Sequence, residues 1–139
     1  MVAKEFISWK SIYETGIQQI DDEHKNLLNI LNNLHRCFIQ KEGSKVGIEI
    51  FKNLIEYTKT HFFHEEEIMR KAKYPKYDEH KNEHRILTRQ VVDFFGIFEK
   101  QQDLMTANML EFLKDWLQYH IKIKDIEFSV WKNDNEKKA

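Results

Sequence analysis

Histidines and carboxylates recur at helical spacing in several parts of this sequence. His61 and Glu65 are four residues apart, and His80 and His84 repeat that interval, while His24 stands alone in another amphipathic stretch. In an α-helix, residues four apart lie about 40° from one another around the axis, so the members of each pair point the same way. Imidazole and carboxylate side chains that converge in this way predict acid–base or metal chemistry.

Each group has an ordinary structural interpretation when it is taken alone. A single histidine on an apolar face, such as His24, is more often a hydrogen-bonded core residue than a metal ligand. Glu65 is harder to explain, because burying a carboxylate without a partner costs several kcal/mol. With His120 and Asp125 from a fourth region, five imidazoles and two carboxylates would meet inside one small domain. That combination favours bound cations over a metal-free core.

The number of donors predicts two metal ions with one open position. Two octahedral metals offer about twelve coordination positions. Five imidazoles fill five of them, two bridging carboxylates fill four, and a bridging oxygen from water fills two. The remaining vacancy falls on the metal with only two imidazoles. Nitrogen and oxygen donors without thiolate suit iron, manganese, zinc or nickel, and carboxylate bridging with abundant imidazole favours iron.

Four segments with the period of an amphipathic helix position these donors. They cover residues 17–40, 45–73, 76–100 and 104–131, and the connections at 41–44, 74–75 and 101–103 are short. Short links between long helices predict an all-α fold, an up-and-down antiparallel four-helix bundle with an N-terminal arm. We expect one domain over residues 1–139, with the arm at 1–16, the bundle at 17–131 and a frayed polar tail at 132–139.

Asp125 does not fit a regular fourth helix. It follows His120 by five residues, which places the two side chains about 140° apart. Lys124 occupies the in-register position, and a cation is a poor metal ligand. We therefore predict a one-residue bulge of the π type between His120 and Asp125, which turns Asp125 toward the centre.

Composition excludes several classes of function. The formal net charge of -1 provides no field for nucleic acid or for an anionic membrane surface, and no apolar stretch approaches a membrane span. Cys37 is the one cysteine, so disulfides within the chain, all-cysteine zinc sites and iron–sulfur clusters are excluded. No export signal is visible at the N-terminus, and we expect a cytoplasmic protein.

Four stretches resemble the hemerythrin family, specifically its bacterial single-domain members. They are GIQQIDDEHK at 16–25, HFFHEE at 61–66, HKNEH at 80–84 and WLQYHIKIKD at 116–125. The resemblance extends from about Trp9 to Phe128, and the four motifs occur in the order and spacing of the family.

The resemblance implies two non-haem iron ions. One iron would be bound by His80, His84 and His120, and the other by His24 and His61. Glu65, Asp125 and a solvent-derived oxo or hydroxo group would bridge them. The family's chemistry would then be reversible O2 binding as a hydroperoxide at the five-coordinate iron, with azide or nitric oxide as alternative ligands. Protein partners are unknown.

An apolar pocket should enclose the open iron position and slow the entry of water. The resemblance and the helical register nominate its walls, which are Leu27, Phe62, Trp116, Leu117 and Ile121. His35 and His64 match no ligand position and are interpreted as structural or exposed. Glu66 and Glu67 are interpreted as surface groups, or as groups that orient a ligand imidazole through its remaining N–H.

Three functions are compared. The first is a non-enzymatic O2-binding protein for carriage, storage, delivery or sensing, and we expect this one. The alternative is a di-iron redox enzyme, such as an oxidase, a ferroxidase or a catalyst that consumes peroxide or nitric oxide. Ferritin-like enzymes of that kind use carboxylate-rich ligation, whereas imidazoles outnumber carboxylates here. A bundle with a structural metal, or with none, is the third and least supported.

Overall fold

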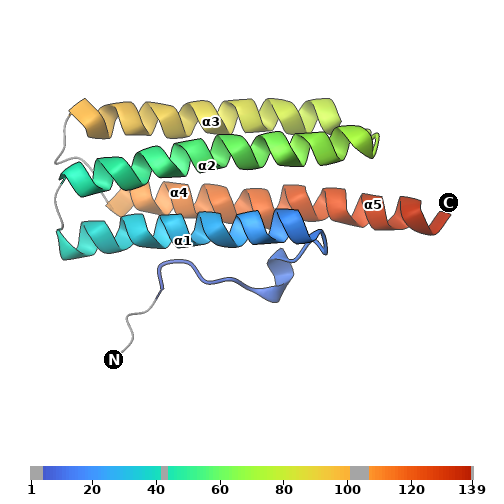
Figure 1. Cartoon of the computed structure of the whole chain (residues 1–139), viewed down its shortest axis with the longest axis horizontal. Helices are drawn as coiled ribbons and strands as arrows, with labels where there is room; N and C mark the ends of the chain where they lie inside the picture. The colour runs from blue at the N-terminus through green and yellow to red at the C-terminus, as the bar shows by residue number, and fades with distance from the viewer. Residues whose placement is uncertain (1–4, 42–43, 101–106, 139) are drawn as a thin grey trace.

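The computed structural model describes residues 5–41, 44–100 and 107–138. Four long helices dominate it (Figure 1), the fourth being divided by a π-helical segment. The elements are η1 (Ser11–Tyr13), α1 (Gln18–Gln40), α2 (Ser44–Lys71), α3 (Tyr77–Lys100), α4 (Ala107–Tyr119), η2 (His120–Asp125) and α5 (Ile126–Lys138).

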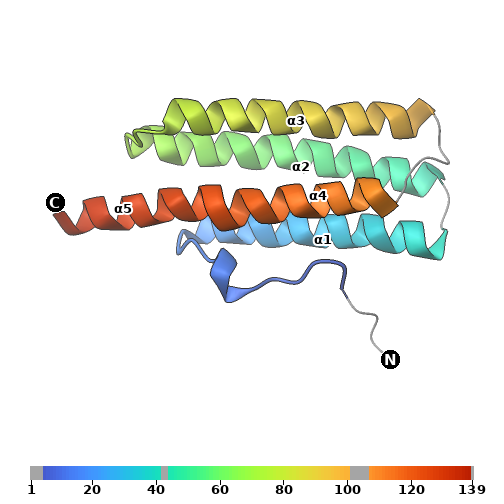
Figure 2. The same cartoon turned by 180° about the vertical axis from the view of Figure 1, so that it is seen from behind.

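α4, η2 and α5 form one continuous helix. This helix and α1, α2 and α3 run in alternating directions and lie side by side (Figures 1 and 2). α2 contacts both α1 and α3, and α4 closes the bundle against α1 and α3. The predicted up-and-down antiparallel four-helix bundle is therefore confirmed. Among the helices in the described ranges, none is both long and apolar enough to cross a membrane.

The ends of the first three helices agree with the sequence prediction to within a few residues. α1 ends at Gln40, and its C-cap residue Lys41 adopts a left-handed conformation with φ 51°. α2 ends at Lys71 and not at Lys73, because Lys73 is left-handed (φ 60°) and Pro75 follows it closely. Residues 42–43 of the predicted 41–44 link and all of the 101–103 link lie outside the described residues.

The last helix continues beyond the predicted end at Trp131. α5 extends to Lys138, so residues 132–138 of the stretch that was expected to be a frayed tail are helical. The segment contains no glycine or proline, and Lys132 forms an ion pair with Glu136 one turn later. Such pairs at four-residue spacing support an exposed helix, and polarity alone did not indicate this.

The N-terminal arm lies along the outside of α1 (Figures 1 and 2). Ile7 is buried, and its backbone exchanges two hydrogen bonds of 2.9 Å with the side-chain amide of Asn32. Tyr13 is also buried, and its hydroxyl accepts a hydrogen bond of 3.2 Å from Gln118. The arm therefore covers the α1 and α4 side of the core as a fixed part of the domain.

The core consists of two apolar clusters with a polar layer between them. The larger cluster begins at Leu27 on α1 and includes Phe62, and the smaller one contains Ile20, Met69 and Phe128. His24 lies between Ile20 and Leu27 along α1, and Glu65 lies between Phe62 and Met69 along α2. The two clusters thus enclose the histidines and carboxylates that the sequence nominated.

Candidate metal centre

The π-helical segment η2 brings His120 and Asp125 to the same inner face. Its six residues, His120–Asp125, interrupt the regular fourth helix at the predicted position. Both side chains are buried, with exposed fractions of 2% and 1%. Lys124, which a regular helix would turn inward, instead forms an ion pair of 3.1 Å with Glu83 on α3. The predicted bulge is confirmed.

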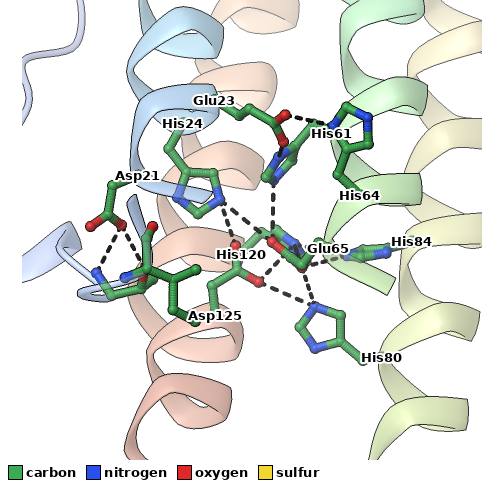
Figure 3. Close-up of polar contacts among 12 residues, drawn as sticks. Asp21, Glu23, His24, His61, His64, Glu65, His80, His84, His120 and Asp125 are labelled. Carbon is green, nitrogen blue, oxygen red and sulfur yellow. Dashed lines mark hydrogen bonds and ion pairs between the residues drawn. The ribbon is translucent and has the colours of Figure 1, made fainter. Parts of the chain in front are cut away.

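Five buried side chains form the first donor group, Glu65, His80, His84, His120 and Asp125 (Figure 3). The Nε2 atoms of His80 and His84 lie 2.7 Å and 3.0 Å from Glu65 Oε1. Those of His80 and His120 lie 3.1 Å and 3.2 Å from Asp125 Oδ1. Three imidazoles therefore surround one oxygen from each carboxylate.

The second donor group uses the other oxygens of the same two carboxylates. It consists of His24, His61, Glu65 and Asp125. His24 Nε2 lies 2.8 Å from Asp125 Oδ2, and His61 Nε2 lies 3.2 Å from Glu65 Oε2. All seven residues that the sequence nominated as metal ligands thus converge, and they divide three to two around a shared pair of carboxylates.

The hydrogen bonds of these side chains do not account for their burial. Among the described residues, His24 Nε2, His61 Nε2, Glu65 Oε2 and both oxygens of Asp125 are buried without a well-directed hydrogen bond, although these nitrogens and oxygens lie close to one another. His84 Nε2 and His120 Nε2 face one another at 3.1 Å, so two ring nitrogens compete for the same space. Buried polar atoms in proteins are normally paired, whereas unpaired nitrogen and oxygen donors that point at common positions suit cations. The residues present fit a pair of metal ions.

Charge–charge contacts inside the centre shift the pKa of its members strongly. Burial lowers the pKa of His61, His80 and His120, but the neighbouring carboxylates outweigh this effect. They raise the pKa of His61 and His80 to about 9 and that of His120 to about 10. Burial likewise raises the pKa of Glu65 and Asp125, yet the surrounding imidazoles hold both well below their usual values. Without metal, these histidines retain protons at neutral pH.

Two further carboxylates contact the outer nitrogens of the imidazoles. Glu23 Oε1 lies 2.8 Å from His61 Nδ1, and its Oε2 lies 2.6 Å from His64 Nδ1 (Figure 3). Glu66 Oε2 lies 2.8 Å from His84 Nδ1. Burial raises the pKa of Glu23, but the hydrogen bonds to both histidines lower it overall.

The sequence identified these outer contacts only in part. The interpretation of Glu66 as a group that orients an imidazole agrees with the structure, and Glu67 is a surface residue that pairs with Arg70. Glu23 was missed. It lies about 100° around the helix from His24, so periodicity assigns it to the surface. Its long side chain nevertheless reaches α2, and its place next to a ligand candidate was the only signal.

The five residues nominated as pocket walls are all buried within the larger apolar cluster. They are Leu27, Phe62, Trp116, Leu117 and Ile121. Phe62 stacks on His84 with ring centroids 3.8 Å apart, so this wall touches the donor group directly. The leftover histidines lie outside both donor groups. His35 stacks on Phe6 at 4.1 Å, and His64 is half-buried beside Glu23.

The fold and its centre define a class of protein, a four-helix bundle with a buried cluster of histidine, glutamate and aspartate that can hold metal. Residues 15–128 match the family described as hemerythrin HHE cation binding domain. The chain belongs to the hemerythrin family.

Relatives of this chain cover most of its length. Bacteriohemerythrin of Clostridium acetobutylicum is 34% identical over 125 residues, which is 86% of this chain and 96% of that protein. Bacteriohemerythrin of Stenotrophomonas maltophilia is 31% identical, and the match covers 84% of this chain and 75% of that protein. Myohemerythrin of Sipunculus nudus is 30% identical, and the match covers 86% of this chain and 88% of that protein. A crystal structure of wild-type hemerythrin superimposes with a TM-score of 0.82 at 26% identity. The match covers 89% of this chain and 95% of that one.

Proposed function

We propose that this chain is a non-enzymatic protein that binds O2 reversibly at a non-haem di-iron centre. The observation that carries the proposal is the shared use of Glu65 and Asp125 by two buried donor groups. His80, His84 and His120 would hold one iron, and His24 and His61 the other. Glu65, Asp125 and a solvent oxygen would bridge the pair. The iron with two imidazoles then has one position left for O2.

An iron pair of this kind supplies the two electrons that bound O2 takes up and returns on release. The chain's own residues hold the iron ligands and limit access to them. Phe62 and Leu117 are 4% and 2% exposed and belong to the apolar wall proposed above. A small apolar molecule can enter such a shell, whereas charged species and bulk water are disfavoured. The wall would therefore slow irreversible oxidation.

The donor set favours binding over enzymatic turnover. Five imidazoles and two carboxylates make up the two groups, whereas di-iron enzymes with a ferritin-like bundle use mainly carboxylates. Neutral imidazoles stabilise the ferrous state and disfavour high-valent iron. Nitric oxide is small and uncharged and can serve as an alternative ligand at the same position, and azide is small enough to bind there at the cost of bringing its charge through the apolar shell. A single cysteine suits the reducing cytoplasm in which we place the protein.

Anaerobic iron loading followed by exposure to air tests the proposal. Wild-type protein should bind two irons per chain and develop a visible charge-transfer band that disappears when O2 is removed. His61→Gln should lose iron and the band, whereas His35→Gln, a matched change outside both groups, should retain both. Sustained O2 consumption with a reductant would support the enzyme alternative. Fewer than two irons in the wild-type protein would refute the di-iron centre.

A further inference from the structure

Two of the imidazoles are held from outside the centre by carboxylates that belong to neither donor group. Glu23, on α1, reaches across to His61 on α2, where Oε1 and Nδ1 are 2.8 Å apart. Glu66, on α2, reaches across to His84 on α3 at the same distance of 2.8 Å. One such contact therefore serves each of the two donor groups.

A carboxylate at Nδ1 determines which ring nitrogen faces the metal. A neutral imidazole has one N–H, and an ionised carboxylate can only accept a hydrogen bond. In the neutral form that binds metal, the N–H of His61 and of His84 must therefore be on Nδ1, which leaves the lone pair on Nε2. In both residues Nε2 is the atom directed at Glu65, 3.2 Å away in His61 and 3.0 Å away in His84.

Glu23 is itself fixed in orientation. Its Oε1 accepts from His61, and its Oε2 lies 2.6 Å from Nδ1 of the half-buried His64. The side chain of Glu23 is only 14% exposed, so little water competes for these bonds. By contrast, Nδ1 of His24 is buried with no hydrogen-bond partner among the described residues. Among the described residues, His61 is therefore the only imidazole of its group that is oriented by a carboxylate from outside the donor groups.

We infer that Glu23 is a positioning residue for the metal bound by His24 and His61, and that Glu66 serves the other metal in the same way. This inference rests on the proposed function, because it assumes that the two groups bind metal. Each carboxylate contacts one imidazole of the donor groups, His61 for Glu23 and His84 for Glu66. Removal of either should weaken one metal and spare the other. Outer contacts of this kind typically change metal affinity about 10- to 100-fold.

Titration of the metal-free protein with Co(II), followed by visible absorption, separates the two sites. His24→Gln identifies the binding step that belongs to the group with two imidazoles. Glu23→Ala should then weaken that step about 10- to 100-fold and leave the other within about threefold. Glu66→Ala should show the opposite selectivity. Glu23→Gln retains an acceptor for His61 and should recover part of the loss. Asp22→Ala, an exposed neighbour on the same helix, should change neither step.

Fold and function are controlled separately. Far-UV circular dichroism melts show whether each variant is folded. If Glu23→Ala is not folded, His64→Ala removes only the outer bond to Glu23 and should still weaken the same binding step selectively. Wild-type binding of fewer than two Co(II) ions would overturn the proposed function. Two ions in the wild type with unchanged affinities in folded Glu23 and His64 variants would overturn only the positioning role, as would equal weakening of both steps.

Discussion

Deleting one residue from the π-helical segment should leave the centre intact. The deletion of Lys122, which is exposed in the middle of His120–Asp125, shortens the spacing between these two side chains from five residues to four. In a regular helix, five residues turn the chain by about 500°, which leaves Asp125 about 140° from His120. Four residues leave only about 40°, so an α-helix without the bulge still directs both side chains inward.

The same deletion about two turns earlier should be destructive. Removing Asp115, an exposed residue of the regular helix α4, turns everything beyond it by about 100°. Ile121 and Phe128, which are 1% and 0% exposed, would leave the core together with the two donors. Truncating a buried Phe costs about 3–5 kcal/mol and a buried Ile about 2–5 kcal/mol. Together these losses reach the whole stability of about 5–15 kcal/mol expected of a domain.

Thermal melts and iron analysis compare the two deletions directly. The Lys122 deletion should melt within a few degrees of wild type and bind two irons per chain, and the Asp115 deletion should not fold at neutral pH. The reasoning is refuted if the Lys122 deletion folds but binds fewer than two irons, or if the two deletions are equally harmful. Either result would mean that the bulge does more than restore the register of Asp125.

Three further outcomes are expected. Ile121→Val should destabilise the fold by only about 0.5–1.5 kcal/mol but speed autoxidation of the air-exposed iron protein, and an unchanged rate across such variants would count against the pocket. Asn32→Ala should lower the free energy of unfolding in urea by about 1–2 kcal/mol, because two hydrogen bonds to the arm are lost; an unchanged value would show that the arm adds little. In metal-free protein, His61, His80 and His120 have pKa values raised from 6.5 to about 9, 9 and 10. The contribution of these three histidines to the stability of the metal-free fold is complete below pH 6.5 and is lost as the pH rises through 9–10. Tm should therefore fall between pH 6.5 and 10. A flat Tm in that range would contradict the shifts.

The fold was predictable because its signals are local and repeated. Four long amphipathic stripes and few helix breakers leave little choice but an antiparallel bundle. The end of the last helix was not predictable in the same way. Residues beyond Trp131 bury little, so no apolar stripe marks them, and the Lys132–Glu136 pair that accompanies the helical turn is a weak signal in any polar sequence.

The donor residues were predictable because each occupies a position that an apolar side chain would normally fill. Asp125 was assigned because it does not occupy such a position. A regular helix would turn it away from His120, so its use as a donor required a break in the helix, and η2 provides that break. Glu23 could not be found in this way. Its position lies about 100° around α1 from His24, and the contact with His61 depends on how closely α1 and α2 approach. Helical periodicity specifies faces, but it does not specify the distances between helices.

Protons and metal ions compete for the same positions in this centre. Two carboxylates are buried among five imidazoles, and the group would be strongly destabilised if all of the imidazoles were neutral and no cation were present. Metal-free protein relieves this by protonating imidazoles, as the raised pKa values of His80 and His120 indicate. Metal binding must release these protons, because a ligating nitrogen needs its lone pair. The acidic pair Glu65 and Asp125 can therefore be buried in either state, and we expect the chain to fold before it binds metal.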